Sequence, residues 1–333
     1  MGDPRVVRVG AVDCGTNSIR LLVADVDPRS GVLTDVLRRM EIVRLGHGVD
    51  RTGLIDPIAM ERTLDVARVY AGQCRSLGAA RVRFVATSAS RDAGNAADFV
   101  AGVEEAFADF GLAPDVISGA EEATLSFRGA TGDVAAHRIP GPYLVVDLGG
   151  GSTELARGTL SVQQSRSVDI GCVRMTERHL RSDPPRADEV VAATRDVDSA
   201  LDDAAGSVDL TGIGALVGLA GSVTTVTAHA LGLLRYDPVA IHLSVLTPSR
   251  VREATSSLLA MSRADRAALG FMHPGRVDVI GAGALVWGRV VERVAAESGL
   301  GEALPVVTSE HDILDGIALS LLPVGPAARE RGS

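Results

Sequence analysis

Lysine is absent from this sequence of 333 residues, so all 33 of its basic residues are arginine. A Walker-type P-loop needs a Gly-Lys-Ser/Thr motif, and a protein kinase needs a lysine on one of its strands, so both classes are excluded. Catalysis through a Schiff base on a lysine side chain is excluded for the same reason. We attribute the absence itself to a compositional bias of the genome.

Aromatic residues and cysteines are also scarce. Aromatic residues make up 3% of the chain, which disfavours a platform for stacking nucleobases, and the net charge of −9 argues further against a nucleic-acid partner. The three cysteines, Cys14, Cys74 and Cys172, form neither a metal-ligand spacing nor a disulfide framework. We interpret Cys14 and Cys172 as small buried residues. The expected setting is a reducing cytoplasm, with no signal peptide.

One segment without Asp, Glu or Arg, residues 211–234, is long enough to cross a bilayer. Five glycines and several hydroxyl residues interrupt it, so we interpret it as a buried strand over 215–219 followed by a buried helix from about residue 224, and we expect no membrane association. The chain is 46% hydrophobic and long enough for two domains, each with its own core.

The most informative feature is a pattern that occurs twice. An apolar run ends in Asp13 and continues as Cys-Gly-Thr-Asn-Ser, and a second apolar run ends in Asp147 and continues as Leu-Gly-Gly-Gly-Ser-Thr-Glu. Glycines in such a turn let backbone N–H groups approach a phosphate closely. Two such turns, 134 positions apart (147 minus 13), predict two similar domains that clamp one phosphate chain.

Each residue of this repeated pattern has an expected role. Asp13 and Asp147 are candidate ligands of Mg²⁺ (or Mn²⁺), which takes one or two carboxylates and keeps several waters. Glu154 is a third candidate, for metal binding or for orienting water, and its alternative is an exposed strand carboxylate. Either turn alone could be an ordinary hairpin turn, but the pair favours phosphate binding. The candidate phosphate ligands here are Gly15, Thr16, Asn17, Ser18, Gly149, Gly150, Gly151, Ser152 and Thr153.

Hydrophobic periodicity predicts the order of the elements. Three strands are followed by alternating helices and strands, and this pattern is roughly repeated after residue 142, which predicts α/β sheets covered on both faces. The expected strands are 5–12, 18–26, 31–44, 81–87, 115–117, 143–148, 152–157, 161–168, 215–219, 277–281 and 305–308. The expected helices are 57–77, with Pro57 at its first position, 95–110, 120–131, 174–180, 186–203, 224–232, 249–259, 263–269, 282–298 and 312–322.

Seven motifs, in order along the chain, resemble those of the Ppx/GppA family of exopolyphosphatases and guanosine pentaphosphate phosphatases. The ordered set is specific, although a single Asp-x-Gly motif would be weak. Longer family members carry an additional C-terminal helical region that resembles HD phosphohydrolases, so this chain is expected to be the short form. The motifs are residues 13–18, 87–91, 117–123, 147–154, 218–222, 278–283 and 309–311, the last followed by Asp315-Gly316.

The resemblance implies an α/β fold with two actin-like (ribonuclease H-like) domains and an interdomain cleft. Domain I is expected over residues 1–130, joined by a C-terminal helix at about 312–322. Domain II is expected over 131–311, and the tail 323–333 is expected to be flexible.

The sequence offers two glutamates as a catalytic base. Glu121 and Glu122 lie in the first turn of a predicted helix, where acidic residues also simply stabilise the helix dipole. The resemblance places the base at the second position of this pair, hence Glu122, with Glu121 as the fallback. It also raises Arg91, otherwise a plausible surface residue, to a phosphate ligand. Arg128, His273 and Arg276 are weaker candidates for a path followed by a polyanion.

The function implied is Mg²⁺-dependent hydrolysis of the terminal phosphoanhydride of inorganic polyphosphate by a glutamate-activated water. Guanosine pentaphosphate (pppGpp) is the alternative substrate. The same fold also supports sugar and acetate kinases, which the Glu121-Glu122 pair and the missing acceptor signature disfavour. A catalytically silent nucleotide-sensing module is the alternative outside enzymes, and family members often form homodimers.

Overall fold

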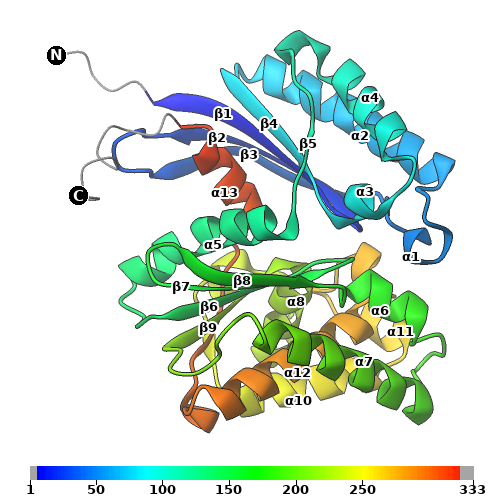
Figure 1. Cartoon of the computed structure of the whole chain (residues 1–333), viewed down its shortest axis with the longest axis vertical. Coiled ribbons are helices and arrows are strands. Elements are labelled where there is room, and N and C mark those ends of the chain that lie inside the picture. The colour runs from blue at the N-terminus through cyan, green and yellow to red at the C-terminus, as the bar shows by residue number, and fades with distance from the viewer. Residues whose placement is uncertain (1–5, 323–333) are drawn as a thin grey trace.

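The computed structural model describes residues 6–322, and the predicted flexible tail 323–333 lies outside them. The first sheet has the order β3-β2-β1-β4-β5, in which β1 pairs antiparallel with β2 and parallel with β4 (Figure 1). The central strand β1 is buried along most of its length because its residues are apolar on both faces. The strands are β1 (Val7–Cys14), β2 (Ser18–Val26), β3 (Leu33–Ile42), β4 (Arg81–Ala86) and β5 (Asp115–Val116).

Helices cover both faces of this sheet. On one face, α2 (Pro57–Ser76) and α4 (Ala96–Ala106) bury Phe84 and Phe99 against the strands. The helix α2 begins where Asp56 accepts hydrogen bonds from two backbone N–H groups and Pro57 takes the first position, as the sequence predicts. The short elements here are α1 (Val49–Thr52), α3 (Ser88–Asp92) and η1 (Ala108–Phe110).

The second sheet, of order β10-β11-β9-β6-β7-β8, repeats the pairing of the first. An antiparallel meander continues into parallel strands, and β10 is added at the far edge. The fold is therefore the expected α/β architecture, with two sheets of similar pairing. The strands are β6 (Tyr143–Leu148), β7 (Thr153–Gly158), β8 (Val162–Val168), β9 (Ala215–Leu219), β10 (Val245–Leu246) and β11 (Val306–Thr308).

The largest hydrophobic core lies between the second sheet and the helices that follow it, with Trp287 fully buried in it. These helices are α6 (Cys172–Arg178), α7 (Ala187–Ala205), α8 (Ala220–Ala230), α9 (Pro238–Ile241), α10 (Pro248–Ala260), α11 (Arg263–Ala267), η2 (Pro274–Arg276), α12 (Ile280–Glu297) and η3 (Gly301–Ala303). Within residues 6–322 no helix is both long and apolar enough to cross a membrane.

Three local predictions are wrong. Residues 277–281 do not form a strand, because α12 already begins at Ile280, and a short apolar run does not distinguish a buried strand from a buried helix. The residue pattern predicts that 87–91 run from the end of a strand into a loop, but residues 88–92 form the helix α3. The helix α8 begins at Ala220, where φ is 69°, directly after β9 and four residues before the expected start.

Two helices connect the sheets. The helix α5 (Gly119–Ala136) packs Ala123 and Phe127 on the second sheet, and α13 (Ile313–Ser320) packs Ile317 on β1 and β2 of the first (Figure 1). The two helices cross at Gly129 and Gly316. A Cβ atom at either glycine would overlap a backbone oxygen of the other segment, Asp312 O or Leu125 O. The backbones therefore lie directly against each other at the crossing.

This crossing predicts opposite effects for two substitutions in α5. Gly129→Ala should destabilise the protein by about 1–3 kcal/mol, because the backbone of Asp312 cannot yield as a side chain could. Gly132→Ala, one turn of the same helix away with open space around it, should stabilise by about 1 kcal/mol. Urea unfolding measures both, and equal effects of the two substitutions would contradict the packing described here.

Candidate active site

The two glycine turns, residues 15–18 and 149–152, have the same geometry. In each, the N–H of the first glycine donates to the carbonyl oxygen of the residue three positions later, Gly15 to Ser18 and Gly149 to Ser152, both at 3.0 Å. Each turn follows the central strand of its sheet, β1 or β6. The hairpins predicted from the repeated pattern are therefore present.

The second glycine turn lies directly against the first. A Cβ atom at Gly150 would be 3.0 Å from Cβ of Thr16 and 3.2 Å from the backbone N of Asn17. A Cβ atom at Gly151 would be 2.6 Å from the hydroxyl oxygens of both Thr16 and Ser88. Any larger residue would hold the turns apart, so glycine is required here for the two halves of the chain to close.

A cleft of about 110 Å³ lies between the halves and contains residues of both turns. Three carboxylates, Asp13, Asp147 and Glu122, contribute to its walls. The side-chain oxygen of Asn17 is buried without a hydrogen-bond partner among residues 6–322, so it is available to a bound group. The further polar side chains and glycines of the lining are Gly15, Thr16, Ser18, Arg20, Thr87, Ser88, Gly149, Gly150, Ser152, Gly221, Ser222 and Arg276.

The register of the two hairpins pairs each aspartate with a different partner. Asp13 lies opposite Arg20, whose Nη2 donates to Asp13 Oδ2 at 2.6 Å, and Asp147 lies opposite Glu154. Arg20 also forms an ion pair with Asp312, just before α13. Burial raises the pKa of Asp13, although Arg20 opposes the shift. The first hairpin thus carries a neutralising arginine where the second carries another carboxylate.

Asp147 is held by the helix that crosses between the sheets. Its carboxylate accepts a hydrogen bond of 2.6 Å from Ser126, four residues after Glu122 on α5. Burial and the nearby charge of Asp312 raise the pKa of Asp147 to about 6, against the lowering effect of Ser126 and Arg20.

Glu122 and Glu154 have the most strongly perturbed carboxyl groups of the site. Glu122 is 8% exposed, and its pKa is raised well above the usual range by burial first and then by the charges of Glu154, Asp147 and Asp13. Burial and Asp147 raise the pKa of Glu154 to about 7, opposed by its hydrogen bond of 2.7 Å from Ser167. Glu154 lies behind the cleft wall and is not the exposed strand carboxylate of the alternative interpretation.

Arg91 lies beside Glu122 instead of in the cleft wall. From α3 it donates to the carbonyl oxygen of Ile117 at 3.1 Å and approaches Glu122 Oε2 at 3.5 Å. Its charge opposes the rise in the pKa of Glu122. The structure therefore brings Arg91 to the glutamate, and a direct contact with phosphate stays a prediction.

Several predicted site residues lie elsewhere. Glu121 points away and binds Arg83 at 2.6 Å with its side chain 46% exposed, so the fallback base lies outside the cleft. The hydroxyl of Thr153 donates to the carbonyl oxygen of Ile170 and does not line the cleft. Arg128 is exposed, and His273 Nδ1 accepts from the N–H of Gly275, which makes it a turn residue. Arg276 alone of the weaker candidates lines the cleft.

The sequence reasoning missed Arg20, Ser126 and Asp312. Arg20 could have been found, because position 20 in the first hairpin corresponds to position 154 in the second (154 minus 134). Ser126 follows Glu122 by four residues, a spacing that places both on one helix face. No local signal links Asp312 to Arg20, which precedes it by 292 positions.

The donor atoms of the site suit a hard divalent cation. Asp13, Asp147, Glu122 and Glu154 bring four buried carboxylates together, and Arg20 and Arg91 beside them supply fewer positive charges. Carboxylate oxygens are the ligands that Mg²⁺ prefers. A cation between the two turns would offset the excess of negative charge.

A larger cavity of about 490 Å³, the side pocket, adjoins the cleft. It shares Arg20, Met40, Ala220, Gly221 and Arg276 with the cleft, so the same side chains line both spaces. Its further walls combine arginines with apolar and aromatic side chains, two hydroxyl residues and two carboxylates, namely Arg38, Arg39, Thr224, Tyr236, Phe271, Met272, His273, Pro274, Ser309, Glu310, Asp312 and Leu314.

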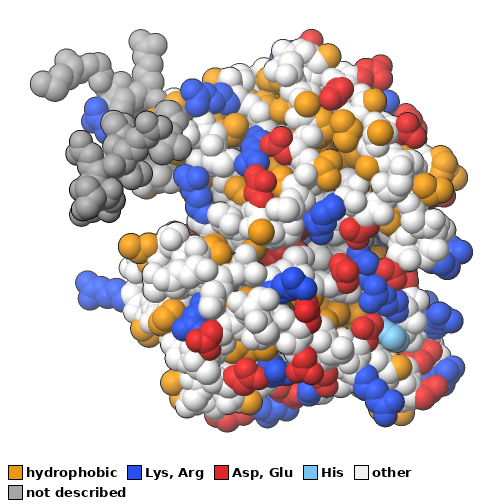
Figure 2. Space-filling view, in the orientation of Figure 1, with side chains coloured by type: hydrophobic (Ala, Val, Ile, Leu, Met, Phe, Trp, Pro, Cys, Tyr) orange, Lys and Arg blue, Asp and Glu red, His pale blue; other side chains and the backbone are white. Residues whose placement is uncertain are grey.

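Ion pairs hold the two halves of the molecule together near the turns. Arg174 on α6 binds Asp50 at 2.7 Å and Asp92 at 2.5 Å, and Arg178 binds Asp50 at 2.8 Å. Figure 2 shows acidic and basic side chains meeting between the upper and lower halves of the molecule, toward the right of the view. These ion pairs connect α1 and α3, next to the first sheet, to α6, next to the second sheet.

The raised carboxyl pKa values predict an unusual dependence of stability on pH. With EDTA present, the free energy of unfolding should fall as pH rises from about 4.5 to about 7, because folded Glu154 binds its proton more tightly than the unfolded chain does. Glu154→Gln should reduce this fall, and Glu121→Gln, which alters an exposed carboxylate, should leave it intact. Urea unfolding across this pH range checks the prediction, which fails if wild type and Glu154→Gln have the same slope.

Comparisons with known proteins agree with this geometry. The model of the Ppx/GppA phosphatase family matches residues 22–314. Exopolyphosphatase 2 of Mycobacterium tuberculosis is 48% identical, over 95% of this chain and 99% of its own. A crystal structure of an exopolyphosphatase-like protein has a TM-score of 0.90 at 43% identity, covering 95% and 98% of the two chains. The Ppx/GppA enzyme of Aquifex aeolicus has a TM-score of 0.75 at 28% identity, covering 95% and 99%.

Proposed function

The chain belongs to the Ppx/GppA phosphatase family, and on that premise we propose that it is an exopolyphosphatase. It hydrolyses the terminal phosphoanhydride of inorganic polyphosphate and releases orthophosphate. The observation that carries this proposal is the closure of two matching glycine turns around a cleft that the buried carboxylate of Glu122 enters.

The two turns bind the terminal phosphoryl group. Their backbone N–H groups and the side chains of Asn17, Ser18 and Ser152 line the cleft from both halves of the molecule. Thr16 stays bonded to Ser88 at 2.8 Å, so it positions the turn. Phosphoryl transfer depends mostly on positioning and on electrostatic stabilisation, which a site assembled from two rigid sheets provides.

Glu122 acts as the general base. It accepts a proton from the attacking water, and its carboxylate must be ionised to do so. The arginine at position 91 favours the ionised form, and Asp147 is fixed by Ser126 on the same helix. Asp13 and Asp147, with Glu154 behind them, would hold Mg²⁺ (or Mn²⁺), which supplies neutralisation of the phosphate charge.

A second candidate substrate is pppGpp, which the side pocket favours. Tyr236, Phe271 and Met272 give it an apolar wall, and two arginines, Arg20 and Arg276, lie where it joins the cleft. Polyphosphate has no apolar part to place there, whereas a nucleoside attached to a phosphate chain would use both kinds of wall. Comparing phosphate release from polyphosphate, pppGpp and ATP separates the two candidates. Release from none of them would favour the silent regulatory module.

The cellular setting is part of the proposal. The cysteines Cys14, Cys74 and Cys172 are all free and buried, which agrees with a reducing cytoplasm. The homodimer that the family resemblance implies stays a prediction.

The adjacent glutamates give a matched pair of variants for the base. Glu122→Gln should lower kcat by about 10²–10⁴-fold, because it removes the proton acceptor and keeps the size of the side chain. Glu121→Gln should retain near wild-type kcat, since Glu121 faces Arg83 outside the cleft. Steady-state phosphate release gives kcat, and calorimetry with tripolyphosphate shows whether binding persists. A Glu122→Gln enzyme that turns over normally would remove this residue from the mechanism.

The metal has its own test. EDTA should abolish phosphate release, and added Mg²⁺ or Mn²⁺ should restore it, because the carboxylates of the cleft would otherwise repel the substrate. Asp147→Asn should raise the Mg²⁺ concentration that gives half-maximal activity, which a Mg²⁺ titration measures. Full activity in EDTA would argue against a divalent cation in the reaction.

A further inference from the structure

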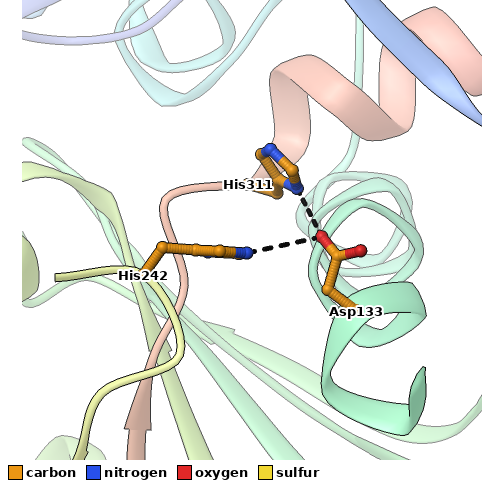
Figure 3. A group of neighbouring side chains, drawn as sticks. All are labelled: Asp133, His242 and His311. Carbon is orange, nitrogen blue, oxygen red and sulfur yellow. Dashed lines mark hydrogen bonds and ion pairs between the residues drawn. The ribbon is translucent and has the colours of Figure 1, made fainter. Parts of the chain in front are cut away.

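Two histidines and an aspartate, none of which lines the cleft, meet in a half-buried cluster. Asp133 comes from α5, His242 follows α9, and His311 lies between β11 and α13 (Figure 3). His311 Nδ1 is 2.6 Å from Asp133 Oδ2, and His242 Nε2 is 3.5 Å from the same oxygen. One donor atom from each residue lies within 4.8 Å of the other two.

This cluster is located where the chain passes between the two sheets. Asp133 lies one helical turn after Gly129, which contacts the backbone of Asp312, the residue next to His311. The segment with His311 leads from the second sheet back to the first, and α5 is the connection in the other direction. A metal ion bound here would therefore link α5 and the His311 segment, which are the two connections between the sheets, to the loop that carries His242.

The donor set differs from that of the cleft. The cleft offers carboxylate oxygens for a hard cation, whereas two imidazoles and one carboxylate suit a first-row transition metal. Sites with three such protein ligands, completed by water, are typical of Zn²⁺. We propose that Asp133, His242 and His311 form a binding site for a divalent transition metal ion of the Zn²⁺ class.

Three further features support this assignment. All three side chains are partly exposed, so an ion can reach them and small rotations can bring the donors to ligand distance. His137 lies four residues after Asp133, at the C-terminal cap of the same helix, and its imidazole is near enough along the chain to turn toward the cluster as a fourth ligand. Its Nδ1 bonds the carbonyl oxygen of Asp133 at 2.9 Å, which leaves Nε2 as the free donor atom.

Metal binding requires a change in the hydrogen bonds of His242. Its Nδ1 accepts from the backbone N–H of Glu310 at 3.2 Å, so the proton of the neutral ring is on Nε2, toward Asp133. Ligation through Nε2 moves this proton to Nδ1, and the Glu310 amide must then turn away. Glu310 also binds the hydroxyl of Tyr236 at 2.6 Å in the wall of the side pocket. Occupancy of the metal site is thus linked to the segment beside that pocket.

Zn²⁺ binding by the full-length, untagged protein tests the proposal. Excess Mg²⁺ occupies the carboxylates of the cleft, and a chromophoric chelator reports competition for Zn²⁺. The wild type should bind one equivalent of Zn²⁺, and Co²⁺ in its place should give visible absorption bands of a nitrogen-ligated, four- or five-coordinate site. His311→Ala and Asp133→Asn should each weaken Zn²⁺ binding by more than the roughly 10–100-fold that loss of a supporting group costs.

His47→Ala is the matched control. His47 also pairs with a carboxylate, Glu177 at 2.8 Å, but among residues 6–322 this pair has no third metal-ligating atom close enough to complete a cluster. This variant should keep the wild-type affinity for Zn²⁺ and the Co²⁺ spectrum, and circular dichroism confirms that every variant is folded. The proposal is overturned if the wild type binds no Zn²⁺ in excess Mg²⁺, or if His311→Ala and Asp133→Asn bind it as tightly as the wild type does.

Discussion

Repulsion among buried carboxylates is the constraint on which the rest of this structure depends. Asp13, Glu122, Asp147 and Glu154 come from both halves of the molecule and are each less than a tenth exposed. Like charges so close in a buried site cannot all stay ionised without compensation. Burial raises the pKa of all four carboxyl groups most, and neighbouring carboxylates, among them Asp312 beside Asp13 and Asp147, raise these pKa values further. The site is therefore poised to take up protons or a cation.

The architecture is arranged to hold that unfavourable cluster in place. Two hairpins of equal geometry bring Asp13 and Asp147 to the cleft, and α5 contributes Glu122 and fixes Asp147 through Ser126. The glycine contacts between the turns and between α5 and α13 leave little room for either half to shift. Ion pairs of Arg174 and Arg178 with Asp50 then connect the halves at the surface. These contacts together stabilise an arrangement of the two halves that the repulsion among the carboxylates opposes.

Much of the fold and of the site could be predicted from the sequence, because these features depend on local residue patterns. The Asp–Gly repeat at positions 13–15 and 147–149 predicts both turns, and hydrophobic periodicity predicts most helices and strands. The choice between Glu121 and Glu122 could not be derived from the residues alone. They are neighbours on one helical turn, about 100° apart, and only the packing of α5 decides that Glu122 faces inward while Glu121 meets Arg83.

Other features depend on contacts between distant segments. The pairing of Arg20 with Asp312 joins positions that no local pattern connects, and the meeting of Asp133 with His242 and His311 needs the full path of the chain. The apolar residues at 277–281 show the limit of periodicity, because a buried helix start and a buried strand have the same composition there.

The central claim is that the two glycine turns hold the terminal phosphoryl group within reach of the side chain at position 122. A crystal structure of the Glu122→Gln protein with tripolyphosphate and Mg²⁺ tests it most directly. The account predicts a terminal phosphate bound by backbone N–H groups of both turns, with a water between it and the amide of the substituted residue. A phosphate chain bound outside the turns, or a terminal phosphate far from position 122, would contradict it.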